Sequence, residues 1–224
     1  MKRNASWRLV LGLIAILATL PGTISAQTEI GFRGGLNFAT FAGTVISGGD
    51  IVVTPESRTG LSLGGFLTLP VFSDFGIQIG AGFTSKGAKV NNTTVRFDYI
   101  EIPVLAKISL SREASNLALH FLGGPAISFR IDCSTRTESF LDGSTADSDC
   151  DDPLVSSTTL KSNEKTDFGV IIGAGLDVSL APSTSLLIEL MYDIGLPELD
   201  RDFANSAKNL VFSILVGMSF KLGG

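Results

Sequence analysis

Apolar residues recur at every second position along most of this chain. The pattern is clearest near the middle, in the series Ile100, Ile102, Val104, Ala106, Ile108 and Leu110. A period of two indicates a β-strand with one apolar face, because successive side chains of a strand point to opposite sides. The same period predicts eight strands, at residues 30–38, 60–69, 75–86, 97–110, 117–130, 167–180, 185–195 and 208–221.

The connections between these predicted strands alternate in length. Short segments rich in Pro, Ser, Asp and Asn, at 70–74, 111–116 and 181–184, follow the second, fourth and sixth strands. Longer polar segments follow the first, third, fifth and seventh. Each predicted strand has the roughly 9 to 11 residues that a tilted strand needs to cross a bilayer. Periplasmic turns and long extracellular loops are typical of outer-membrane barrels. We therefore expect an all-β fold, an eight-stranded antiparallel up-and-down transmembrane β-barrel.

The two faces of the predicted strands differ in chemistry. One face is almost uncharged and is assigned to lipid; it carries Phe32, Leu36, Phe38, Leu61, Leu63, Leu67, Leu69, Phe75, Ile77, Ile79, Phe83, Leu186, Ile188, Leu190, Tyr192 and Ile194. The other face mixes Gly and Ser with Arg33, Asn37, Gln78, Lys86, Glu101, Lys107, His120, Arg130, Asp167, Asp177, Glu189, Asp193 and Lys221. A soluble lipocalin-like barrel would turn the two faces the other way, and the period alone does not separate these arrangements. Strand length, loop sorting and the uncharged face favour the membrane.

The start of the chain predicts export. Three basic residues precede an apolar run at 9–20, and the small residues that end at Ala26 suit signal peptidase. The run is shorter than the roughly 20 residues of a membrane-spanning helix, so a cleaved signal peptide at 1–26 is favoured over an uncleaved anchor. Residues 27–224 would then form the barrel domain. Losing three basic residues and no acids changes the formal net charge from −5 to −8, which argues against nucleic acid as a partner.

Several segments, taken in order, are similar to one known family. The segments GFRGGLNFATF, FDYIEIPVLAKISL, FLGGPAISFR, TDFGVIIGAGLDV and LLIELMYDIGL resemble the PorT-like outer-membrane β-barrel family common in Bacteroidetes. The most specific piece is the YIEIPVLAK run from Tyr99 to Lys107. The resemblance implies a Gram-negative outer-membrane barrel of eight strands. The family's namesake is linked to a protein secretion system, a role that most members do not share, so the resemblance implies fold and location rather than secretion. One departure is that Phe220 is followed by Lys-Leu-Gly-Gly, whereas such barrels often end on an aromatic residue.

Charged residues predicted to face the barrel interior form the main candidate site. The lumen of an eight-stranded barrel is just wide enough to be filled by side chains, and charges in such an interior need partners. We expect a structural network of ion pairs rather than a proton or solute pathway. Its predicted members are Arg33, Glu101, Lys107, His120, Arg130, Asp177, Glu189 and Asp193.

His120 is the only histidine. A lipid-modifying barrel enzyme would need a histidine beside a serine on the lipid-exposed surface, at the level of the outer leaflet. His120 is instead predicted to lie near a periplasmic turn and to face inward, so neither its depth nor its direction suits that chemistry. The sequence predicts no catalytic residues, no cofactor and no metal site.

The segment at 131–166 contains both cysteines. In an oxidising compartment Cys133 and Cys150 predict a disulfide, and closing about 18 residues would stabilise the fold by roughly 3 kcal/mol in the chain-entropy model. Two cysteines without a nearby histidine do not complete a zinc site. The second cysteine lies in an acidic stretch formed by Asp142, Asp147, Asp149, Asp151 and Asp152. We expect a solvated tip, with divalent cations that bridge to lipopolysaccharide as the alternative.

These patterns favour a non-enzymatic outer-membrane barrel with a structural or binding role. The alternatives are a narrow solute or ion channel, a lipid-modifying enzyme and the soluble lipocalin-like barrel. Expected partners are outer-membrane lipid, lipopolysaccharide and the barrel assembly machinery, and a partner outside the cell would meet the loops at 41–59 and 131–166. Nothing in the sequence requires more than a monomer.

Overall fold

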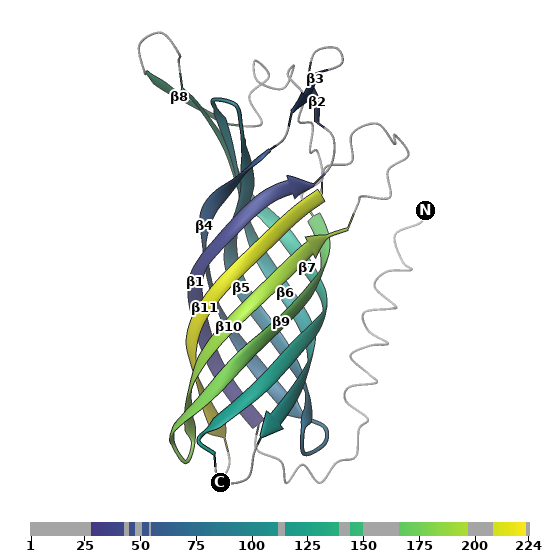
Figure 1. The fold of residues 1–224 in the computed structure, drawn as a ribbon, viewed down its shortest axis with the longest axis vertical. Coiled ribbons are helices and arrows are strands. Elements are labelled where there is room, and N and C mark those ends of the chain that lie inside the picture. Colours follow the sequence, from purple (N-terminus) through teal and green to yellow (C-terminus); the bar gives the residue numbers. More distant parts are fainter. Residues whose placement is uncertain are drawn as a thin grey trace, which may run out of the picture.

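The protein forms a closed antiparallel barrel of eight strands (Figure 1), which confirms the predicted fold class. A computed structural model describes residues 28–42, 45–47, 51–53, 55–111, 115–138, 144–149, 166–196 and 208–222. The barrel strands are β1 (Thr28–Ala42), β4 (Glu56–Pro70), β5 (Phe75–Val90), β6 (Thr93–Ser111), β7 (Leu117–Glu138), β9 (Thr166–Ala181), β10 (Thr184–Gly195) and β11 (Lys208–Leu222). Three short strands lie outside the ring: β2 (Val45–Ser47), β3 (Ile51–Val53) and β8 (Thr145–Asp149).

Each barrel strand pairs with the next one along the chain, and β1 pairs with β11 to close the ring. That last pairing runs from Thr28 opposite Leu222 to Ala42 opposite Lys208. None of the described residues belongs to a helix that is long and apolar enough to cross a membrane. The predicted signal peptide lies outside the described residues, so cleavage after Ala26 stays a prediction.

The alternation in the sequence becomes an apolar outer wall and a polar interior. Leu63 is 65% exposed and Phe32 51% exposed, whereas the side chains of Gln78 and His120 are buried inside the ring. A soluble barrel would bury its apolar face, because exposed apolar area of this extent is unfavourable in water. The lipocalin-like arrangement is therefore wrong.

The strand ends that flank the three predicted short turns lie at the end of the barrel where β1 begins and β11 ends, as predicted. At the opposite end the strands are longer than the sequence indicated. The predicted outer loop between residues 86 and 97 is wrong, because β5 and β6 continue to Val90 and Thr93 and are joined by a two-residue turn. Asn91 has φ 52° there, a conformation that Asn adopts more readily than most residues.

One side of the barrel wall continues beyond the rim as a sheet, which we call the outer extension. It consists of β5 from residue 89, β6 up to residue 94, β7 from residue 134 and the whole of β8 (Figure 1). Beyond Phe129, β7 loses β9 as a neighbour and pairs with β8 instead, from Ser134 opposite Asp149 to Glu138 opposite Thr145. The segment predicted as a loop at 131–166 is thus partly a β-hairpin.

Candidate functional site

A chain of alternating charges occupies the barrel interior near the short turns. We call it the lower network; its members, in order of contact, are Glu29, Lys107, Asp177, His120, Glu189 and Arg33. Lys107 Nζ lies 3.2 Å from Glu29 Oε2 and 3.5 Å from Asp177 Oδ2. Arg33 Nη1 lies 2.7 Å from Glu189 Oε2. Each cation is thus next to an anion, which buried charges require.

His120 is in the middle of the lower network, with a carboxylate on each side of its ring. Its Nε2 lies 3.2 Å from Glu189 Oε1. Its Nδ1 lies 3.1 Å from Asp177 Oδ2, at an angle that does not make a hydrogen bond. His120 is fully buried and Glu189 is 1% exposed, so the ring has no access to lipid or solvent. This placement agrees with the predicted inward orientation of His120.

A glycine allows His120 and Glu189 to meet. The register places Gly175 opposite His120 on one side and opposite Glu189 on the other. A Cβ atom at position 175 would lie 2.5 Å from His120 Nε2 and 2.9 Å from Glu189 Cγ. The two side chains can therefore contact each other across β9 only because residue 175 has no side chain.

We expect Gly175→Ala to lower the free energy of unfolding by about 1 to 3 kcal/mol, the usual cost of adding an atom to a packed interior. Urea unfolding of the folded barrel in detergent micelles measures the change. Gly123→Ala is a matched control, because the nearest atom to its Cβ would be 4.0 Å away. Equal stability of the two variants would contradict the packing argument.

A second group of charges, which we call the upper network, lies nearer the outer rim and consists of Lys86, Glu101 and Asp193. Lys86 Nζ lies 2.7 Å from Glu101 Oε2 and also contacts Asp193 Oδ2. Ser128 donates a hydrogen bond of 3.0 Å to Glu101. Lys86 is 3% exposed, so its buried cation is stabilised by the two carboxylates beside it.

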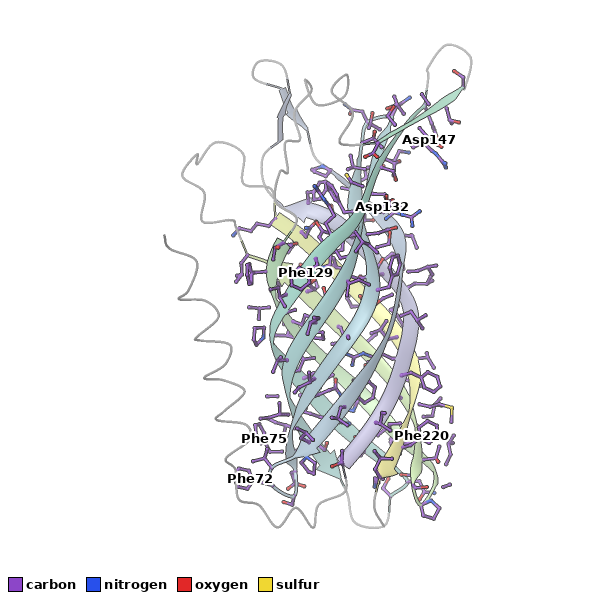
Figure 2. All side chains as sticks on the ribbon, turned by 180° about the vertical axis from the view of Figure 1, so that it is seen from behind. Phe72, Phe75, Phe129, Asp132, Asp147 and Phe220 are labelled. Atoms are coloured by element: carbon purple, nitrogen blue, oxygen red, sulfur yellow. The ribbon has the colours of Figure 1, made fainter. Side chains whose placement is uncertain are left out.

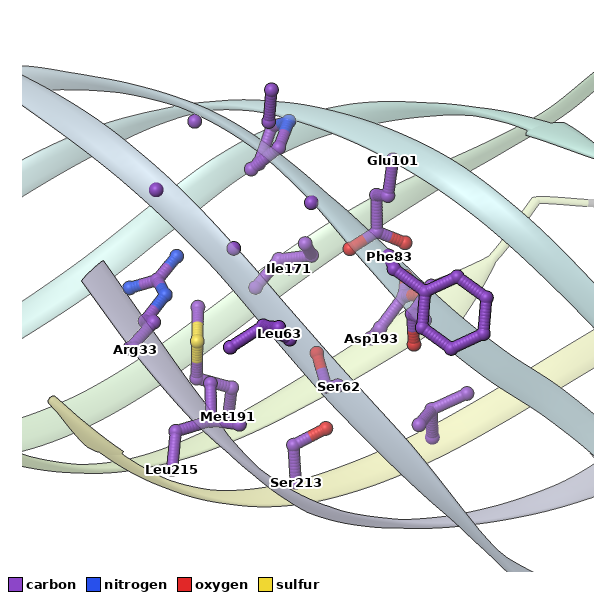
Figure 3. A pocket seen from close by; sticks show the side chains of 18 residues that line it. Arg33, Ser62, Leu63, Phe83, Glu101, Ile171, Met191, Asp193, Ser213 and Leu215 are labelled. Carbon is purple, nitrogen blue, oxygen red and sulfur yellow. The ribbon is translucent and has the colours of Figure 1, made fainter.

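Between the two networks the lumen is mostly apolar. The layer consists of Leu105, Leu122, Ala126, Ile171, Met191 and Leu215. Beside it a cavity of about 60 Å³ remains against β4 and β5 (Figure 3), where Gly64, Gly80 and Gly82 contribute no side chain. Such a volume holds a few water molecules and no larger solute.

An aromatic plug fills the lumen above the upper network. It is formed by Phe41, Ala88, Val95, Phe97, Tyr99 and Cys133. The Phe97 ring lies 6.1 Å from that of Phe41 and 6.4 Å from that of Tyr99. The Arg130 guanidinium lies over Phe97, 5.8 Å from the ring centre. Apart from the cavity of about 60 Å³, the described residues thus occupy the lumen from Glu29 to Phe41 in four layers.

The structure divides the predicted lumen residues between these layers. Five of them are in the lower network: Arg33, Lys107, His120, Asp177 and Glu189. Glu101 and Asp193 are in the upper network, and Arg130 is at the plug.

Two network residues are absent from the predicted set. Lys86 was omitted although its face was assigned correctly, and Glu29 precedes the predicted start of its strand. The inward parity of residues 29, 31 and 33 could have indicated Glu29.

The outer extension is polar. Arg136 makes two hydrogen bonds to Asp147 across the β7–β8 hairpin, of 2.7 and 3.0 Å, although both side chains are 62% exposed. Hydrogen bonds from Arg136 hold the pKa of the Asp147 carboxyl below its usual range. Figure 2 shows Asp132 above Phe129 and Asp147 farther along the extension. Among the described residues, no three His, Cys, Asp or Glu side chains gather in a way that could hold a metal ion.

The acidic stretch and the predicted disulfide are only partly described. Cys133 belongs to the aromatic plug and is 7% exposed. Cys150, Asp142, Asp151 and Asp152 lie outside the described residues. The disulfide and the divalent cation site therefore stay predictions.

Comparisons with known proteins agree with this geometry. A family model described as "Outer membrane protein beta-barrel domain" matches residues 25–201. No curated protein matches the chain in sequence.

Several solved outer-membrane proteins are similar in structure. Neisserial surface protein A is 12% identical, with 86% of this chain and 97% of that chain covered and a TM-score of 0.48. OprG from Pseudomonas aeruginosa is 13% identical, with 88% and 96% covered and a TM-score of 0.49. Ail, the attachment invasion locus protein of Yersinia pestis, is 15% identical, with 87% and 100% covered and a TM-score of 0.41. Likeness at this level concerns the fold and says nothing about activity.

Proposed function

Because this chain belongs to the outer membrane protein beta-barrel domain family, we propose that it is a closed barrel without catalytic activity that acts by binding at its outer surface. The observation that carries the proposal is the filled lumen. Two charged layers, one apolar layer and one aromatic layer follow each other inside the ring. A barrel closed in this way offers partners its outer wall and the parts beyond the rim.

The burial of His120 supports the absence of catalysis. A histidine that acts on a lipid must reach the lipid, whereas this ring is enclosed by Asp177 and Glu189 and is fully buried. His120 is not among the residues that line the cavity of about 60 Å³. A substrate therefore has no route to it within the described part of the barrel.

The outer extension supports binding. A connection between two barrel strands needs only a few residues, yet β6 and β7 run for 19 and 22 residues and continue as paired strands beyond the rim. Ordered backbone on a rigid scaffold presents side chains in fixed positions, as recognition surfaces do. We propose that this sheet and its acidic hairpin contact the extracellular partner, with outer-membrane lipid and lipopolysaccharide around the wall.

Single-channel recording in planar bilayers tests the closed lumen. We expect no conductance above the protein-free baseline for the folded barrel. Steady openings would contradict the proposal and support the channel alternative. A shift in gel mobility on heating, which a folded barrel shows, confirms that the protein under test is folded.

Binding by intact cells tests the outer extension. Cells that display the wild-type barrel are compared with cells in which residues 139–165 are replaced by a short Gly-Ser linker, using arrays of glycans and basic peptides as probes. We expect binding to be lost in this variant and kept when residues 197–207 are replaced in the same way. Equal binding by all three would contradict a role for the extension.

The absence of catalysis is tested separately. Unchanged lipid A acylation on expression would agree with it.

Within the family, we propose that the chain belongs to the PorT-like subgroup found in Bacteroidetes, because the YIEIPVLAK run and the segments around it match that pattern. We further propose a cleaved signal peptide at 1–26, assembly by the barrel assembly machinery and a monomeric barrel.

We also propose the disulfide between Cys133 and Cys150. The β7–β8 register supports it, because Ser134 is opposite Asp149 and an antiparallel register continued by one residue pairs positions 133 and 150. We expect the boiled protein to migrate faster without reductant than with it, and Cys150→Ser to abolish the difference. Unfolding should require roughly 3 kcal/mol less in the variant. Identical migration with and without reductant in the wild type would show that the disulfide is absent.

A further inference from the structure

The turn between β4 and β5 has an apolar tip, unlike an ordinary turn in water. It spans residues 71–74, and Phe72 is 71% exposed, more than any other large hydrophobic side chain described. Val71 beside it is 43% exposed. The described turn between β9 and β10, by comparison, consists of Pro182 and Ser183. Turns are usually polar because they face water, so the Val-Phe pair needs a different environment.

The backbone holds this tip in a fixed position. The N–H groups of Val71 and Phe72 both donate to the carbonyl oxygen of Phe75, at 2.9 and 3.0 Å. The N–H of Ser109 donates to the carbonyl oxygen of Asp74 at 2.8 Å, which ties the turn to β6. The Phe72 and Phe75 rings lie 6.2 Å apart (Figure 2). The exposed ring is therefore part of the folded turn.

The apolar tip is continuous with the lipid-facing wall. Phe75 is opposite Ile108 in the β5–β6 register, and Ile108 is 46% exposed. Leu110 and Leu117, at the same end of β6 and β7, are 54% and 47% exposed. Since the wall faces lipid in an outer-membrane barrel, its direct continuation meets the same bilayer.

The polar half of the turn fits the boundary of a bilayer. Ser73 Oγ donates to Asp74 Oδ2 at 3.3 Å, and both side chains are exposed. An element with an apolar part and a polar part next to each other is stable where hydrocarbon meets water. From this combination we propose that Val71 and Phe72 insert into the periplasmic leaflet of the outer membrane, a phospholipid surface, and anchor the β4–β5 end of the barrel there.

Tryptophan fluorescence tests this anchor directly. The only tryptophan in the sequence is Trp7, so a barrel prepared from residue 27 onward has none and each introduced tryptophan reports alone. Phe72→Trp is compared in phosphatidylcholine vesicles with Phe32→Trp, which replaces a side chain of the lipid-facing wall, and with Ser183→Trp at the other turn. The probes are brominated acyl chains, which quench from the membrane, and iodide, which quenches from water.

We expect Phe72→Trp to emit at a shorter wavelength than Ser183→Trp and to be quenched several-fold more strongly by brominated lipid, as Phe32→Trp is. Iodide should quench Ser183→Trp several-fold more than Phe72→Trp. If Phe72→Trp instead matches Ser183→Trp in both respects, the anchor proposal is wrong. Shielding of Phe72→Trp in native membranes but not in vesicles would also overturn it, because a protein would then cover the turn. Gel mobility before and after heating establishes that each variant is folded.

Discussion

Replacement of Glu189 by Leu should lower the free energy of unfolding by about 3 to 5 kcal/mol, the range found when one partner of a buried ion pair is removed. Glu189 Oε2 lies 2.7 Å from Arg33 Nη1, and Glu189 Oε1 lies 3.2 Å from His120 Nε2. The leucine would leave the Arg33 charge inside the lumen without a carboxylate, beside the amide oxygen of Gln78 at 3.2 Å and the Phe66 ring at 5.3 Å. Urea unfolding in detergent micelles, followed by circular dichroism, measures the loss.

A double variant separates the lost pair from the lost packing. Arg33→Met combined with Glu189→Leu removes both charges of the pair, and a buried ion pair replaced by apolar residues is often tolerated. We expect this barrel to be more stable than Glu189→Leu alone. Asp147→Asn, at the exposed hairpin, should change stability little. If Glu189→Leu is as stable as the wild type, the lower network does not stabilise the barrel.

Phe97→Ala should have a loss of similar size, about 3 to 5 kcal/mol, because a large buried aromatic side chain is replaced by a small one. Phe97 is 7% exposed and contacts Phe41 and Tyr99 in the aromatic plug. The plug also includes Cys133, on the part of β7 that continues into the outer extension. The variant should therefore be cleaved faster by protease in the extension than in the barrel wall.

Two measurements control this result. Phe97→Leu keeps much of the apolar volume and should lose clearly less stability than Phe97→Ala. Conductance of Phe97→Ala should stay at the baseline, because the two networks and the apolar layer still fill the lumen below. Protease cleavage that is unchanged from the wild type would show that the plug does not support the extension.

The sequence predicts the structure best in the membrane-spanning part of the barrel. Side chains such as Phe32 and Arg33 alternate because one meets lipid and the next meets the lumen, and this period marks strands, faces and short turns locally. Beyond the rim, polar and charged side chains such as Lys89, Thr94 and Arg136 interrupt this period, although Ala88 and Val95 still belong to the plug. For that reason the ends of β5, β6 and β7 were predicted as loops, although the pair Asn91-Asn92 is a recognisable turn signal.

The sequence predicts which charged residues face the lumen, but not which of them contact one another. The sequence places Glu101 and Asp193 on the inward face, but Lys86 joins them only through the stagger of strands that are distant along the chain. The contact between His120 and Glu189 similarly depends on the register that puts Gly175 between them. The register depends on how all eight strands close into a ring, and the pattern of a single strand does not determine it.

The junction between β1 and β11 joins the two ends of the chain, yet it is as extensive as the junctions between consecutive strands. Thr28 lies opposite Leu222 at the end where the short turns are, so a linker between them would add one more turn of the same kind. Opening the chain at residues 182–183 would then give a circular permutant in which every strand keeps both neighbours. The folded ring thus has no intrinsic first strand, and the order in which its strands are synthesised is a property of the gene rather than of the barrel.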